Sequence, residues 1–114
     1  LPGPTAFIPA LVMSGLPSDS FIFEGFLPRK KGRKSKLYEI SQNTKTTILY
    51  ESPFRIIKTL SEMKEAIGSD RKIAIVREIS KIYEEVFRGT IDEAILEYSE
   101  RTIKGEFVIC IDKA

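Results

Sequence analysis

The chain has 114 residues, of which 42% are hydrophobic and 30% charged, a composition typical of one globular domain and one that excludes disorder as the main state. Its longest uncharged stretch, residues 1–18, is broken by prolines and glycines, so it predicts neither a membrane span nor a signal peptide. Histidine is absent, which excludes histidine-based triads, and we expect no metal site. The single cysteine, Cys110, excludes an internal disulfide, and a cytoplasmic protein fits best.

Up to residue 50 the chain predicts helices and strands in alternation. Thr5 is placed to cap a first helix that ends at Gly15, because the apolar residues between them follow helical spacing. The next elements are a strand over Phe21–Glu24, a loop over 25–32, a helix over Lys34–Ser41 and a strand over Thr46–Tyr50.

The next strand, turn and helix unit is the clearest in the chain. Ser52 and Pro53 predict an N-cap and a first-turn proline, and they precede a helix that Gly68 ends. The apolar face of this helix has a spacing of three or four residues and consists of Ile56, Leu60, Met63 and Ile67.

The remaining residues predict three strands and one helix. The strands are Lys72–Arg77, Glu84–Arg88 and Phe107–Ile111, and Thr90 with Glu93 forms a capping box ahead of the helix. The link between the first two of these strands is too short for a helical crossover. The sequence therefore predicts an α/β fold, a single layered domain with a mixed sheet of about five strands flanked by about four helices.

Six of the eighteen basic residues stand within eight positions that contain no acid, at Arg29, Lys30, Lys31, Arg33, Lys34 and Lys36. This run predicts a positive patch on a body that is otherwise mildly acidic. Charge alone is equally consistent with a solvated face, but the position between a strand and a helix favours a polyanion such as an RNA backbone. We expect Arg29, Lys30, Lys31 and Arg33 to contact RNA from a surface loop.

Five short motifs follow one another in an order and spacing that resemble one known family. They are Leu1–Ala6, Glu24–Arg33, Tyr50–Arg55, Arg77–Lys81 and Lys104–Glu106. Through them the chain resembles the C-terminal half of the ribosomal RNA small subunit methyltransferase I family, within the tetrapyrrole methylase superfamily. It departs from the family pattern at Phe54, where histidine is usual, and at Ser80 and Tyr83, where threonine and histidine are usual.

The resemblance implies a two-domain enzyme that transfers a methyl group from S-adenosylmethionine to the ribose 2′-hydroxyl of a cytidine in small-subunit ribosomal RNA. It further implies a cofactor cleft between the two domains and a homodimer. Residues 1–114 would be the C-terminal domain, without its N-terminal domain, and the opening Leu1–Pro4 is typical of the interior of a longer polypeptide. We expect this chain alone to be inactive.

The matched motifs also imply roles for single residues. The candidates for cofactor contact are Pro4, Thr5 and Ala6, and those for substrate contact are Glu51, Arg55 and Arg77. A 2′-hydroxyl is weakly acidic, and Glu78 and Lys81 are the candidates for removing its proton. Each group also has a plain structural explanation, as a linker, a helix start or a surface ion pair.

Two other functions stay open at this point. One is a methylase half that acts on a corrin or porphyrin precursor, whose carboxylates basic residues could also hold. The other is a non-enzymatic RNA-binding module. The basic run and the Glu51-Ser52-Pro53 turn favour the RNA methyltransferase over the first, and the match to five motifs favours it over the second.

Overall fold

The computed structural model describes residues 15–16, 20–80, 83–100 and 105–114, with the backbone alone for 78–80 and 83–84. The elements alternate along the chain as β1 (Phe21–Phe26), α2 (Arg33–Gln42), β2 (Thr46–Glu51), α3 (Ile56–Ile67), β3 (Lys72–Ser80), β4 (Tyr83–Thr90), α4 (Ile91–Ser99) and β5 (Glu106–Ile111).

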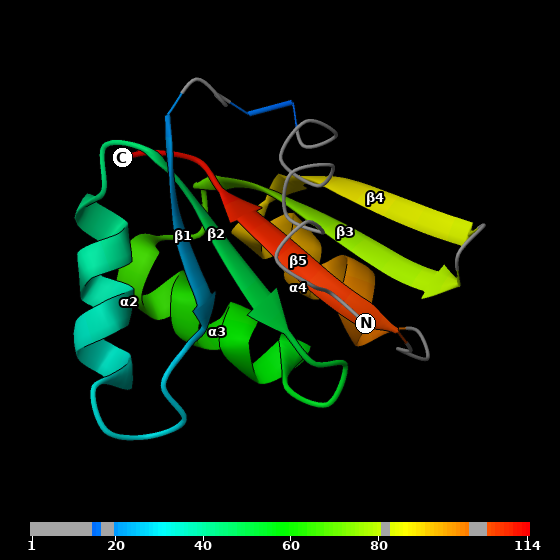
Figure 1. Cartoon of the computed structure of the whole chain (residues 1–114), viewed down its shortest axis with the longest axis horizontal. Helices are drawn as coiled ribbons and strands as arrows, with labels where there is room; N and C mark the ends of the chain where they lie inside the picture. Colours follow the sequence, from blue (N-terminus) through cyan, green and yellow to red (C-terminus); the bar gives the residue numbers. More distant parts are fainter. Residues whose placement is uncertain (1–14, 17–19, 81–82, 101–104) are drawn as a thin grey trace.

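The five strands form one sheet in the order β1-β2-β5-β3-β4 (Figure 1). The neighbours β1 and β2 are parallel, and the other neighbouring pairs are antiparallel. The predicted α/β fold with a single mixed sheet is confirmed. Three of the four predicted helices are present, and the fourth, which follows Thr5, lies outside the described residues.

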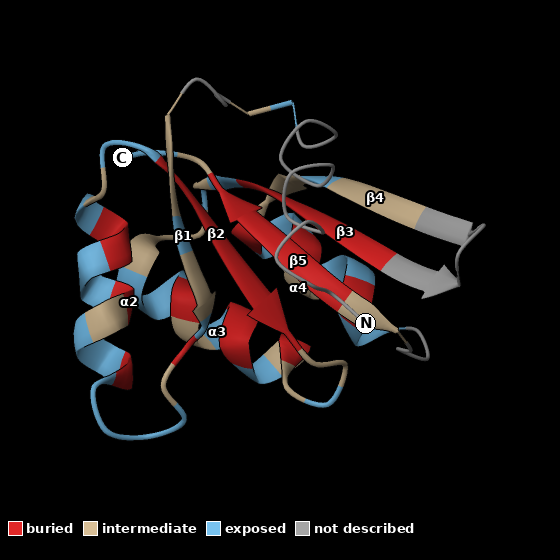
Figure 2. Ribbon diagram, in the orientation of Figure 1, coloured by how far each residue is buried: buried red, intermediate tan, exposed pale blue. Residues whose placement is uncertain are grey.

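Both faces of the sheet are buried along its central strands. The helices pack against one face, where the core includes Leu60 of α3, Tyr98 of α4 and Ile109 of β5. The opposite face holds a second cluster, formed by Ile48, Tyr50, Ala74, Val76, Val108 and Cys110. Burial on both sides explains why β2 and β5 have continuous apolar runs instead of alternating ones (Figure 2).

Pairing between neighbours makes β1, β3 and β4 longer than the sequence predicts by two or three residues, while β2 and β5 each gain one residue. β1 continues to Phe26 because it stays paired with β2 past an irregularity between Phe23 and Gly25, so the loop after it spans only 27–32. β3 and β4 form a hairpin whose register runs from Lys72 opposite Thr90 to Ser80 opposite Tyr83. The extra residues gain backbone hydrogen bonds that local propensity does not reveal.

Two of the predicted helix caps lie within the described residues, and they have different outcomes. The capping box of α4 is confirmed, since the Thr90 hydroxyl accepts a hydrogen bond from the Glu93 N–H and the Glu93 carboxylate accepts one from the Thr90 N–H. The predicted cap at Ser52 is wrong: α3 begins at Ile56, its N-cap position is Arg55, and no side chain caps it. Residues 53–55 instead form a turn, closed by a hydrogen bond from the Arg55 N–H to the Ser52 carbonyl.

Candidate functional site

Four of the five sequence motifs meet at one edge of the sheet. β1 and β2 are parallel, and β5 is antiparallel to both β2 and β3, so the carboxyl ends of β1, β2 and β3 lie at the edge where β5 begins (Figure 1). We use the name site edge for this region, which consists of the end of β1, the loop 27–32, the turn 52–55, the end of β3 and the start of β5. In open α/β sheets, ligands bind at the carboxyl ends of the strands. The fifth motif, Leu1–Ala6, lies outside the described residues, together with its cofactor candidates.

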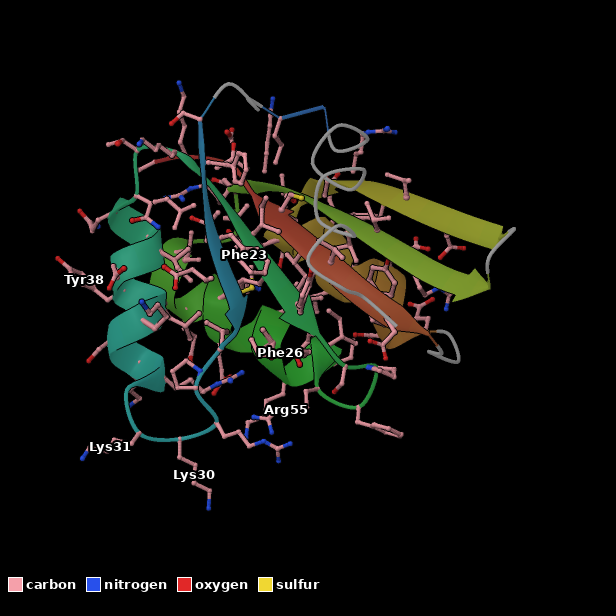
Figure 3. All side chains as sticks on the ribbon, in the orientation of Figure 1. Phe23, Phe26, Lys30, Lys31, Tyr38 and Arg55 are labelled. Atoms are coloured by element: carbon pink, nitrogen blue, oxygen red, sulfur yellow. The ribbon has the colours of Figure 1, made fainter. Side chains whose placement is uncertain are left out.

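Exposed cations occupy the loop at the site edge. Arg29, Lys30 and Lys31 are exposed, and none of them forms an ion pair within the described part of the chain. Lys30 and Arg55 lie at the same end of the molecule as Phe26 (Figure 3). The prediction of a positive surface loop therefore holds for Arg29, Lys30 and Lys31.

Arg33 is an exception to that prediction. It is the first residue of α2 and only 5% exposed, so its predicted place on a surface loop is wrong. Its guanidinium contacts the Glu62 carboxylate at 2.7 Å, donates to the Thr59 hydroxyl at 2.8 Å and donates to the Pro28 carbonyl at 3.0 Å. A buried cation needs such partners to offset the loss of water. Arg33 therefore anchors the loop to α3 and does not present its charge to an external phosphate.

The buried hydroxyl of Thr59 connects the loop to the turn. It accepts a hydrogen bond from Arg33 and donates one to a carboxylate oxygen of Glu51 at 2.5 Å. The other oxygen of Glu51 accepts a hydrogen bond from the Ser52 N–H at 2.8 Å. We call Arg33, Thr59 and Glu51 the polar relay. Because every link is buried or half-buried, the polar relay holds the basic loop and the turn 52–55 in one relative position.

Sequence reasoning missed Thr59. The signal was present, because Thr59 lies on the apolar face of α3 beside Ile56, Leu60 and Met63, and all four are fully buried. A hydroxyl on such a face needs a partner inside the protein. The identity of that partner is not local, since Arg33 lies 26 positions earlier in the chain and Glu51 eight.

Glu51 and Arg77 occupy matching places in the sheet. Both pair with Phe107 of β5, which lies between them, and both are 6% exposed. Arg77 contacts the carboxylate of Glu85, its register partner on β4, at 3.3 Å. The structure thus gives both side chains partners within the fold, and their contact with substrate stays a prediction.

Two further titratable side chains lie beside β1. Lys36 of α2 contacts Glu24 of β1 and Glu39, each at 3.3 Å, and the hydrogen bond to Glu24 is the main cause of a raised Lys36 pKa. Burial raises the pKa of Tyr50, whose ring packs edge-on against the rings of Phe23 and Phe26. Both pKa shifts favour the protonated form of the group.

The catalytic candidates lie at the end of β3. The backbone of Glu78 pairs with Glu106 of β5 at the site edge, and the side chain of Glu78 is not among those described. Lys81 lies outside the described residues. The role of either residue as a base therefore stays a prediction.

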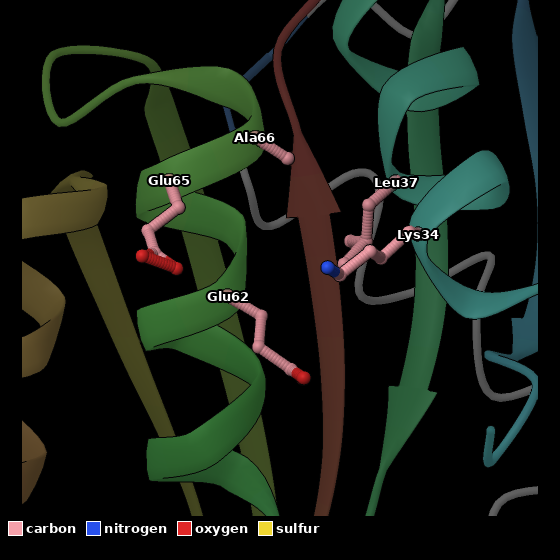
Figure 4. A pocket seen from close by; sticks show the side chains of 5 residues that line it. All are labelled: Lys34, Leu37, Glu62, Glu65 and Ala66. Atoms are coloured by element: carbon pink, nitrogen blue, oxygen red, sulfur yellow. The ribbon is translucent and has the colours of Figure 1, made fainter.

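A groove of about 360 Å³ lies between α2 and α3 (Figure 4). Lys34 and Leu37 line it from α2, and Glu62, Glu65 and Ala66 line it from α3. Glu62 is already bonded to Arg33. In the described part of the chain, no group of three acidic or cysteine side chains could hold a metal ion, and no helix is long and apolar enough to cross a membrane.

Comparison with known proteins identifies the family. A family model described as Tetrapyrrole (Corrin/Porphyrin) Methylases matches residues 1–95. The chain belongs to this tetrapyrrole methylase family. This membership confirms the superfamily that the sequence motifs predicted.

Curated proteins resemble the chain over nearly its whole length. Proteins named ribosomal RNA small subunit methyltransferase I are 43% identical over 112 residues in Synechocystis sp., 46% over 114 residues in Vibrio cholerae and 40% over 111 residues in Thermotoga maritima. The alignments cover 97% of this chain in each case, and the chain spans 40%, 40% and 50% of those relatives. The motif resemblance to proteins of this name is confirmed.

Solved structures agree with the tetrapyrrole methylase fold. A cobalt precorrin-4 methyltransferase of cobalamin biosynthesis and the methyltransferase CobJ both align with a TM-score of 0.71, at 16% and 19% identity, over 98% and 100% of this chain and 50% of theirs. A uroporphyrin-III C-methyltransferase from Thermus thermophilus, complexed with S-adenyl homocysteine, aligns with a TM-score of 0.56 at 16% identity, over 89% of this chain and 48% of that one. At these identities the likeness concerns the fold alone.

Proposed function

We propose that the chain is part of an S-adenosylmethionine-dependent methyltransferase that modifies small-subunit ribosomal RNA, at the 2′-hydroxyl of a cytidine. The names of the curated relatives, at 40–46% identity, support the enzyme class and the RNA substrate. The single observation from the structure that carries the proposal is the site edge, where three cations without ion-pair partners among the described residues stand beside the other family motifs.

In this proposal the loop cations bind the RNA backbone. Arg29, Lys30 and Lys31 are exposed on a loop that the polar relay holds in place, so they can meet phosphates without further ordering of the loop. Contacts with phosphates position a nucleic acid and carry no sequence information. The choice of nucleotide must then come from the fold of the RNA and from other parts of the enzyme.

S-adenosylmethionine would supply an activated methyl group on a sulfonium. The described residues do not by themselves enclose it: the site edge carries cations and aromatic rings, while none of the residues that line the groove between α2 and α3 belongs to a family motif. We therefore propose that residues 4–6 and an N-terminal domain complete the cofactor cleft. Much of the rate would come from alignment of the hydroxyl with the methyl group, and Glu78 or Lys81 would accept the proton of the hydroxyl late in the reaction.

Action on a corrin or porphyrin precursor is the weaker alternative. Solved structures whose titles name a precorrin or a uroporphyrin are only 15–16% identical to the chain. An enzyme of ribosomal RNA would be cytoplasmic, and we propose a homodimer by analogy with the family.

The test is methyl transfer to small ribosomal subunits by the intact protein. In one variant Arg29, Lys30 and Lys31 are replaced together by Ser. The matched control replaces Lys45, Lys72 and Lys113, which are exposed at the opposite edge of the sheet, where β2 and β3 start and β5 ends.

We expect the loop variant to raise the KM for subunits about tenfold or more and to lower the salt slope of RNA binding by about 0.9 per lost contact on duplex, or about 0.7 on single strands. The control should change neither quantity beyond the general effect of three lost charges. Equal effects in the two variants would refute the RNA-binding role of the loop, and an intact protein without methyl transfer to RNA would refute the enzyme assignment.

A further inference from the structure

Two large aromatic rings at the site edge are exposed to solvent. Phe54 is 95% exposed in the turn after β2, and Phe26 is 62% exposed at the end of β1. A phenyl ring left in water forgoes about 2 kcal/mol of transfer free energy that burial would provide. Because β1 and β2 are parallel neighbours, both rings belong to the same edge.

The structure restrains the ring of Phe26 and the backbone that carries Phe54. The ring of Phe26 packs edge-on against Tyr50, with centroids 5.6 Å apart. Phe54 belongs to a turn that is closed by its own backbone hydrogen bond and joined through Glu51 and Thr59 to the basic loop. The Phe26 ring therefore loses little conformational freedom when a ligand covers it, and the turn fixes the backbone position from which Phe54 projects.

Cations flank each ring. Arg29, Lys30 and Lys31 follow Phe26 within five positions, and Arg55 follows Phe54 directly. Figure 3 shows Phe26, Lys30 and Arg55 at one end of the molecule. An apolar protein partner would fit the rings but not the surrounding charge, and an RNA duplex would fit the charge but keep its bases stacked inside. Unpaired nucleotides offer phosphates to the cations and base faces to the rings.

We propose that Phe54 and Phe26 stack on unpaired bases of the RNA, so that the site edge selects a single-stranded or bulged segment over a duplex. The inference rests on the proposed RNA-directed function and specifies the kind of RNA that the site edge binds. Stacking tolerates different bases because every base has a flat π-face, so these two rings select unpaired structure without selecting a sequence.

Binding of two labelled RNAs by the intact protein tests the proposal. One probe is a 12-nucleotide single strand and the other is its blunt duplex. The variants are Phe54→Leu, Phe26→Leu and Phe54→Tyr, and the matched control is Tyr38→Leu, which removes a 64% exposed ring from α2 (Figure 3).

We expect Phe54→Leu and Phe26→Leu each to weaken single-strand binding by roughly 5- to 150-fold, the range for loss of one base stack. Duplex affinity should change less than twofold, and the salt slope should be unchanged because no cation is lost. Phe54→Tyr keeps a flat ring and should bind like the parent. Tyr38→Leu should bind both probes as the parent does.

Several outcomes would overturn the stacking proposal. One is that Phe54→Leu and Phe26→Leu bind the single strand with an affinity within twofold of the parent. A second is that these variants lose as much affinity for the duplex as for the single strand. A third is that they change the self-association of the protein and leave RNA binding intact. The last outcome would make Phe54 a protein contact. If the variant of Arg29, Lys30 and Lys31 loses RNA binding while the Phe variants keep it, only the stacking proposal is refuted. The proposed function would then still hold.

Discussion

Replacement of Thr59 by Val tests whether the polar relay holds the site edge together. Valine has nearly the same shape, so the change removes the hydroxyl and leaves no cavity. Two hydrogen bonds to charged groups are lost, one from Arg33 and one to Glu51. Such bonds contribute about 1.5–3 kcal/mol each, but Arg33 keeps Glu62 and Glu51 keeps the Ser52 N–H, so we expect a loss of about 2–4 kcal/mol in total.

The measurement is urea unfolding of the intact protein, supported by thermal unfolding. For a domain of this size a loss of 1 kcal/mol lowers Tm by about 4 °C, so we expect a fall of about 8–16 °C. Thr59→Ser is the control, because it keeps the hydroxyl and should lose only about 1 kcal/mol for one buried methyl group. A Thr59→Val protein within about 0.5 kcal/mol of the parent, or a Ser variant as unstable as the Val variant, would show that the polar relay adds no stability.

Two further predictions concern helix starts and pH. Thr90→Ala should lower the free energy of unfolding by about 1 kcal/mol through loss of the capping box. Ser52→Ala should change the free energy of unfolding by less than about 0.5 kcal/mol because Ser52 caps no helix. Equal losses in the two variants would contradict the start of α3 at Ile56. Burial raises the pKa of Tyr50 above its ordinary 10.0, and the hydrogen bond to Glu24 raises that of Lys36 above its ordinary 10.5. The folded state holds these protons more tightly, so this stabilisation is complete below the ordinary pKa values and is lost as pH rises through the raised ones. Above about pH 10, the free energy of unfolding measured with urea should fall as pH rises, and it should fall less steeply in Tyr50→Phe. An equally steep fall in that variant would show that other groups cause the loss of stability.

The sequence by itself determined the type and order of the elements from Phe21 to Ile111. Local signals carry that information: the apolar spacing of α3, the β-branched run of β2 and the capping box at Thr90 all act within a few neighbouring residues. The family motifs were also legible in the sequence, because each is a short continuous segment.

Only the tertiary structure decided which charged residues are exposed. Arg33 stands in the same basic run as Lys30 and Lys31, yet it is buried because Glu62, 29 positions later, and Thr59 meet it from α3. Likewise, the motifs converge on one edge only because β5 inserts between β2 and β3 with the opposite direction. Strand pairing and side-chain burial depend on contacts between residues far apart in the chain, and local propensity does not determine them.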